Sequence, residues 1–88
     1  MADEMKRRGL LSRQDAIRSS GMSESGFNRL NLTPTERVGR QTFYRVRDIV
    51  AAVLRREALR SPVLESLAKV SPRAAEAAAA ALADEALR

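Results

Sequence analysis

The spacing of apolar side chains changes along the chain, and each spacing predicts a different element. In residues 13–30 the few apolar side chains recur at helical intervals, interrupted at Gly21. In residues 35–45 β-branched and aromatic side chains surround Gly39, which is typical of a short hairpin. From residue 48 onward the apolar positions return to intervals of three and four residues. The pattern therefore predicts a mainly α fold with a small β-hairpin and C-terminal helices.

Two short helices are expected close together in the first half of the chain. Ser12 is a good N-cap for a helix over 13–20, and Gly21 can adopt the left-handed conformation that ends one. Ser23 can cap a second helix over 24–30, so only a Gly-Met-Ser turn separates the two. This is a helix-turn-helix arrangement, in which the first helix holds the second and the second offers its outer face to a groove. The inner contacts are expected from Ala16, Met22, Phe27 and Leu30.

The outer face of the second helix carries side chains that packing does not use. At about 100° per residue, Phe27 and Leu30 point inward while a polar group points the other way. Within such a group, asparagine can make two hydrogen bonds to adenine and arginine can make two to guanine. The alternative interpretation is a solvated helix face. The residues of this outer face are Glu24, Ser25, Asn28 and Arg29.

A hairpin is expected over residues 36–45, with its turn at a Gly-Arg pair. Val38 and either Phe43 or Tyr44 can pack against the helices. A basic hairpin that follows a helix-turn-helix is a wing. The alternative is a connecting hairpin whose arginines only increase solubility. The side chains expected at the hairpin tip are Arg37, Arg40, Gln41 and Arg45.

Three further helices are expected in the second half of the chain, the first of them starting near Asp48 and closing the core. Ser61 and Ser71 are each followed by proline, a pairing that starts helices, and this predicts helices over 62–69 and 72–87. The last helix is rich in alanine, so it can pack closely against a partner helix or fray as a solvated tail. The apolar positions of the first of these helices are Ile49, Val50, Val53, Leu54 and Ala58.

Composition excludes several classes of function. With 88 residues the chain is long enough for one domain with a small core. It has no cysteine and no histidine, so the usual transition-metal ligands and the commonest general base are missing. We expect no catalytic residue, no metal, no cofactor and no enzymatic activity. Because the chain has no apolar run of roughly 20 residues and no signal-peptide pattern at its N-terminus, we also expect a cytoplasmic protein without a membrane partner.

The net charge of +5 comes from the first half of the chain. Residues 1–47 hold ten Lys and Arg against five Asp and Glu, whereas residues 48–88 hold six of each. Arginine accounts for 14 of the 16 basic residues, and its planar guanidinium suits phosphate and guanine. A basic half of this kind is typical of nucleic-acid-binding proteins. We therefore expect double-stranded DNA as a partner, contacted by Arg13, Ser23, Glu24, Ser25, Asn28, Arg29, Arg37, Arg40, Gln41 and Arg45.

The segment from Leu10 to about Arg56 resembles the winged helix-turn-helix domains of the MerR-like and excisionase-like superfamily, which also includes the DNA-binding domains of phage terminase small subunits. The matching stretches are LLSRQDAIRSSGMSESGFNRL, VGRQTFYR and RDIVAAVL, in the order of that family. The resemblance implies that the second helix enters the major groove and that the wing contacts the DNA backbone or minor groove. Ile17, where a small residue is usual, and Gly26, inside the second helix, depart from the pattern. The residues to which the resemblance gives these roles are Ser23, Glu24, Ser25, Asn28 and Arg29 in the helix, and Arg40 and Gln41 in the wing.

The resemblance also implies a small DNA-binding module with appended helices. We expect a basic N-terminal leader over 1–9, a winged helix-turn-helix domain over 10–60 and a helical oligomerisation or docking segment over 61–88. This plan is similar to that of a phage terminase small subunit, a DNA-packaging protein whose partner is a large terminase or another phage protein. Two alternatives remain open: an excisionase or transcriptional repressor of a mobile element, and a helical adaptor or assembly protein without specific DNA binding. A homo-oligomer, a dimer or larger, is expected through Val63, Leu64, Leu67, Val70, Leu82 and Leu87.

Overall fold

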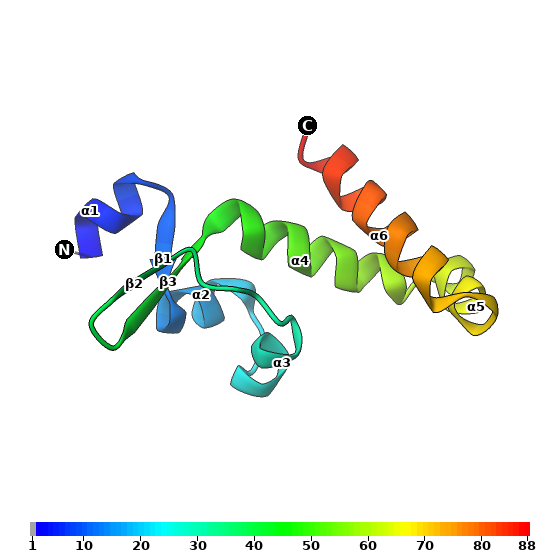
Figure 1. The fold of residues 1–88 in the computed structure, drawn as a ribbon, viewed down its shortest axis with the longest axis horizontal. Coiled ribbons are helices and arrows are strands. Elements are labelled where there is room, and N and C mark those ends of the chain that lie inside the picture. The colour runs from blue at the N-terminus through cyan, green and yellow to red at the C-terminus, as the bar shows by residue number, and fades with distance from the viewer. Residues whose placement is uncertain (1) are drawn as a thin grey trace. The chain divides into compact units, whose positions relative to one another are not determined.

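The computed structural model describes residues 2–88, and the side chains of residues 4–88. It is mainly helical with one small antiparallel sheet, which confirms the predicted mainly α fold with a β-hairpin (Figure 1). None of the helices in this described part of the chain is both long enough and apolar enough to cross a membrane. In chain order the elements are α1 (Ala2–Arg7), β1 (Leu10–Ser12), α2 (Arg13–Ser20), α3 (Glu24–Arg29), β2 (Glu36–Val38), β3 (Gln41–Arg45), α4 (Val46–Leu59), α5 (Pro62–Val70) and α6 (Pro72–Ala86).

The chain divides into two compact units, Met1–Val50 and Ala51–Arg88. The first unit contains α1, α2, α3 and the sheet. The second contains α5, α6 and the larger part of α4, because the division falls inside that helix. All the residues predicted to contact DNA therefore belong to the first unit.

The two short helices begin and end where their capping residues predict. The Ser12 hydroxyl accepts a hydrogen bond from the Asp15 backbone N–H at 3.3 Å, and the Ser23 hydroxyl accepts one from the Gly26 N–H at 3.1 Å. Gly21 ends α2 in the left-handed conformation, with a φ of 70°. Each cap satisfies a backbone donor that the first turn of a helix leaves without a partner. Local sequence alone therefore accounts for the short turn between α2 and α3.

The predicted hairpin forms, and a third strand that was not predicted completes the sheet. β2 and β3 pair antiparallel around a turn at Gly39, whose φ is 63°, and Arg40. β1 pairs with the other edge of β3, so the strand order is β1-β3-β2. The sequence pattern identifies residues 10–12 only as the start of the following helix. So short a strand is stable here because β3 supplies its hydrogen-bonding partner and the helices cover the sheet.

Each face of the sheet carries one buried aromatic side chain of β3. On one face Phe43 packs with Met5 and Leu10. On the other face Tyr44 meets Phe27 of α3 edge to face, with ring centroids 5.4 Å apart and planes at 89°. Neighbouring residues of a strand point to opposite faces. Both aromatic residues of β3 are therefore buried, where the sequence pattern predicted one or the other.

α4 begins at Val46, two residues before the predicted start at Asp48. Ile49 is buried at 5% exposure, whereas Val50, another apolar position of this helix, is 39% exposed. Consecutive residues of a helix are about 100° apart, so these two side chains cannot both lie on a narrow buried face. Of these two apolar positions, only Ile49 therefore lies in the core.

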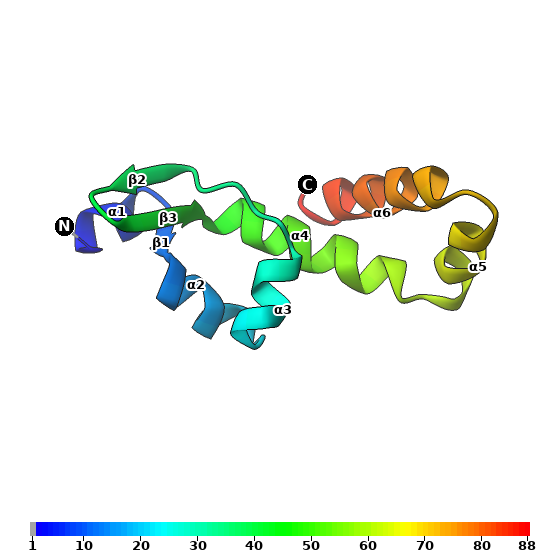
Figure 2. The same cartoon turned by 60° about the horizontal axis from the view of Figure 1, so that its bottom comes forward.

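In the second unit both proline-led helices form. The Ser61 and Ser71 hydroxyls accept hydrogen bonds from the backbone N–H three residues later, at 3.3 and 3.2 Å, which confirms the predicted starts. α5 turns the chain, and α6 follows it in a new direction (Figure 2). The buried residues of α6 are Ala75, Ala79 and Ala83, four residues apart and at most 2% exposed. Of the two alternatives for the alanine-rich segment, the structure therefore has the packed helix, whose small side chains allow a close approach along one face.

Candidate nucleic-acid interface

The polar residues of α3 lie on its exposed side. Gly26 and Phe27 are buried, and Phe27 is only 2% exposed. Ser23, which was predicted to contact DNA, uses its hydroxyl to cap the helix. The predicted division of this helix into an inner and an outer face is confirmed. The exposed residues of the outer face are Glu24, Ser25, Asn28 and Arg29.

Arg13, at the start of α2, contacts three residues of α3. Its Nη2 donates a hydrogen bond to Oδ1 of Asn28 and lies 3.5 Å from Oε1 of Glu24. Its guanidinium carbon lies 5.5 Å from the centre of the Phe27 ring, within the range of a cation–π contact. Arg13 therefore links the first helix to both the buried and the exposed side of the second.

A surface hollow of about 360 Å³ lies between the helices and the turn of the hairpin. Arg13 and Glu24 line it from the helices, and Arg40 and Gln41 line it from the hairpin. α2 packs against β3, which places the hairpin turn beside the start of the helix. Four of the residues predicted to contact DNA, from parts of the chain far apart in sequence, are thus brought to one surface hollow.

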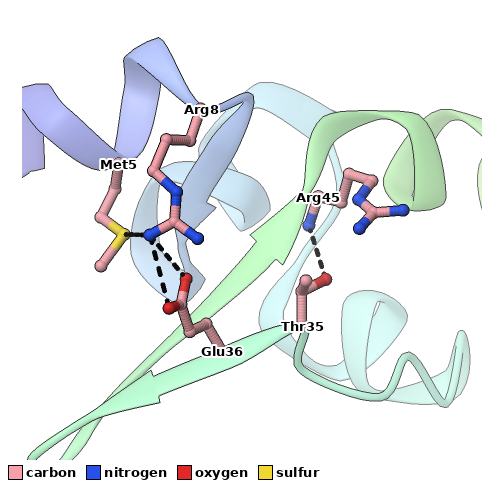
Figure 3. Close-up of polar contacts among 5 residues, drawn as sticks. All are labelled: Met5, Arg8, Thr35, Glu36 and Arg45. Atoms are coloured by element: carbon pink, nitrogen blue, oxygen red, sulfur yellow. Dashed lines mark hydrogen bonds and ion pairs between the residues drawn. The ribbon is translucent and has the colours of Figure 1, made fainter.

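The two other hairpin arginines do not line this hollow. Arg37 is opposite Thr42, and residues 42 and 45 of β3 point to opposite faces, so Arg37 and Arg45 lie on opposite faces of the sheet. The backbone N–H of Arg45 donates a hydrogen bond to the Thr35 hydroxyl at 3.2 Å, while its side chain is exposed (Figure 3). The placement of Arg45 at the hairpin tip is wrong, because the length of β3 separates it from the turn.

A contact between the N-terminal segment and β2 was not predicted. Arg8 Nη1 donates a hydrogen bond to Oε1 of Glu36 at 3.4 Å and lies 3.1 Å from its Oε2 (Figure 3). Met5, on α1, is 7% exposed and packs on the sheet. Within the predicted basic leader over residues 1–9, Ala2–Arg7 therefore forms a helix that Met5 packs against the sheet; Met1 lies outside the described residues. In the sequence, the only indication of this packing was the apolar Met5 between charged neighbours, which is too little to predict a contact.

Comparison of the chain with protein-family models, with curated proteins and with solved structures found no match. Within the described residues, no three side chains of the kinds that bind metal ions lie together. The surface around α3 combines exposed hydrogen-bonding side chains with arginines on neighbouring elements. Such a surface suits a polyanion that also presents polar base edges.

Proposed function

We propose that this protein binds double-stranded DNA, with α3 in the major groove and the β2–β3 hairpin as a wing against the backbone. The observation that carries the proposal is that Glu24, where the outer face of α3 begins, lines the same surface hollow as Arg40 and Gln41 of the hairpin. Further along that face, Arg29 can pair with a guanine edge through two hydrogen bonds, and Asn28 can also hydrogen-bond a base edge. Arg40, at the hairpin turn, is suited to a phosphate.

The distribution of charge supports this assignment. The surplus of five positive charges lies in residues 1–47, which carry the helix and the hairpin, and residues 48–88 have no surplus. Arginines near the DNA backbone replace condensed counterions, so this surplus supplies a sequence-independent and salt-dependent part of the affinity. The exposed side chains of α3 supply the sequence-dependent part.

The resemblance to winged helix-turn-helix domains favours one biological role among those that duplex binding allows. We propose a phage-type DNA-recognition subunit, similar to a terminase small subunit, which acts in DNA packaging with a large terminase as its protein partner. An excisionase or a repressor of a mobile element uses the same kind of module. A preferred DNA site that overlaps a promoter or a recombination site would favour one of these two instead.

We further propose that the protein forms at least a dimer through its second unit. Val63 and Val70 of α5 are 76% and 85% exposed, and Leu82 of α6 is 51% exposed. A single small domain reads few base pairs, so two copies on one site raise both affinity and specificity. Leu64 was also predicted for this interface, but it is 6% exposed and packs within the chain, so we do not include it. The other two residues predicted for the interface, Leu67 and Leu87, are partly buried.

The same exposed apolar residues favour a second candidate function, that of an adaptor or assembly protein. In that case the partner is a different protein and the basic first unit has no DNA ligand. The salt dependence of DNA binding separates the two candidates, because an adaptor without a DNA site has no phosphate contacts to lose.

Titration of the full chain against a fluorescent random-sequence duplex at increasing KCl tests the proposal. If about five phosphates are neutralised, the slope of log affinity against log salt is about −4.5. Arg40→Ala should weaken binding to every sequence and make the slope shallower by about one unit. Arg73→Ala, an exposed change in α6, is the control that should leave both unchanged. A wild-type slope near zero would overturn the proposal and favour the adaptor.

Sequence reading is tested separately by selecting preferred duplexes from a random library. Asn28→Ala and Arg29→Ala should each weaken binding to the preferred site by roughly 1–3 kcal/mol and relax its sequence. Arg40→Ala should leave the preferred sequence intact. If Arg40→Ala changed the preferred sequence while Asn28→Ala and Arg29→Ala left it intact, the assignment of α3 to the bases and of the hairpin to the DNA backbone would be contradicted.

A further inference from the structure

The guanidinium of Arg13, predicted from the sequence to contact DNA, is already engaged by side chains of α3. It donates to Asn28, pairs with Glu24 at 3.5 Å and lies over the Phe27 ring at 5.5 Å. We propose that Arg13 is a positioning residue, which orients the Asn28 amide and the Glu24 carboxylate for base reading and does not itself contact DNA. This inference rests on the proposed function.

The hydrogen bond from Arg13 fixes which way the Asn28 amide faces. A guanidinium has only donors, so the amide atom beside it must be the carbonyl oxygen, because the reverse orientation would set N–H groups against N–H groups. With Oδ1 engaged by Arg13, the NH₂ group of the exposed Asn28 is offered to the groove. Asn28 should therefore select a base that presents an acceptor, such as a purine N7. Without Arg13 both amide orientations become available and the selection weakens.

The pairing with Glu24 explains why Arg13 is a poor phosphate ligand. The Glu24 side chain is 74% exposed and that of Arg13 is 35% exposed, so the carboxylate is the more accessible member of the pair. The two charges cancel locally, which leaves little net attraction for a phosphate. The guanidinium also lies over the buried Phe27 ring, and this cation–π contact holds it near α3. Arg13 should therefore contribute to sequence preference and not to the salt dependence of binding.

Selection from a random duplex library tests the effect on sequence preference, with the full chain and the variant Arg13→Lys. Lysine keeps the charge, but its compact ammonium on a flexible stem cannot hold Asn28 and Glu24 in one fixed geometry. The discrimination at the base read by Asn28 should fall roughly tenfold. Arg18→Lys, in the same helix and paired with Asp15 at 3.8 Å, is the matched control and should keep the wild-type preference. A wild-type preference in Arg13→Lys would overturn the inference.

Two further measurements separate positioning from direct contact. Arg13→Lys added to Asn28→Ala should cause no additional loss of discrimination at that base, because no amide remains to be oriented. Arg13→Ala should keep the wild-type salt slope; a slope shallower by about one unit, with the preferred sequence retained, would identify a phosphate contact and overturn the inference alone. Absence of duplex binding by the wild type would overturn the proposed function and this inference together.

Discussion

Phe27 is the residue through which the candidate recognition helix is held on the sheet, and replacing it tests whether its ring contacts matter. It is 2% exposed, meets Tyr44 edge to face and carries the Arg13 guanidinium over its ring. Phe27→Leu keeps a large apolar side chain but removes the ring. The chain offers a matched control, because its only other phenylalanine, Phe43, is equally buried and packs with Met5 and other aliphatic neighbours on the opposite face of the sheet.

The expected difference between the two variants follows from the contacts that only Phe27 makes. An edge-to-face aromatic pair contributes about 0.5–1.5 kcal/mol beyond the area it buries. A cation–π contact contributes about 0.5–1 kcal/mol at a site as accessible as that of Arg13, whose side chain is 35% exposed. Phe27→Leu should therefore lower the free energy of unfolding by about 1–2.5 kcal/mol more than Phe43→Leu does. This is a large share of the roughly 5–15 kcal/mol that stabilises a typical domain.

Urea unfolding followed by tyrosine fluorescence measures this difference. Tyr44 is the only tyrosine, the chain has no tryptophan, and Tyr44 lies in the same unit as both phenylalanines, so the signal reports on the unit that is perturbed. The slope of the transition should be the same in both variants, which makes the midpoints comparable. Equal losses in the two variants, or a larger loss in Phe43→Leu, would refute the argument that the ring contacts of Phe27 hold α3 in place.

Three further predictions concern other parts of the chain. Ala79→Leu should lower stability by about 1–3 kcal/mol in thermal melts followed by circular dichroism, because Ala79 is 0% exposed, whereas Ala77→Leu on the exposed side of α6 should change it by less than about 0.5 kcal/mol. Gly21→Ala should lower the free energy of unfolding measured in urea by about 1–2 kcal/mol, because a φ of 70° is strained for a residue with a Cβ even though that Cβ would meet nothing within 4 Å. Gly21→Asn should lower it by less, because asparagine adopts the left-handed conformation more readily than alanine. Val63→Asp combined with Val70→Asp should convert the proposed dimer to a monomer in sedimentation experiments at micromolar concentration, and an unchanged mass would place the interface elsewhere.

The helices and the hairpin were predictable because short-range interactions specify them. Ser12, Ser23, Ser61 and Ser71 each satisfy a backbone donor three residues later, and Gly21 supplies the left-handed conformation that ends α2. The two faces of α3 were equally predictable, since the angle between successive residues of a helix depends on backbone geometry alone.

Contacts between distant segments were decided only by the tertiary structure. β1 is a strand because β3 lies beside it, and both Phe43 and Tyr44 are buried because helices cover both faces of the sheet. Arg13 was predicted as one of the DNA-contacting residues, and its contacts with Asn28 and Glu24 arise only when α2 and α3 pack together. The periodicity of the sequence shows which residues share a face of one helix or strand. It does not show which other element packs against that face, because that depends on contacts between distant parts of the chain.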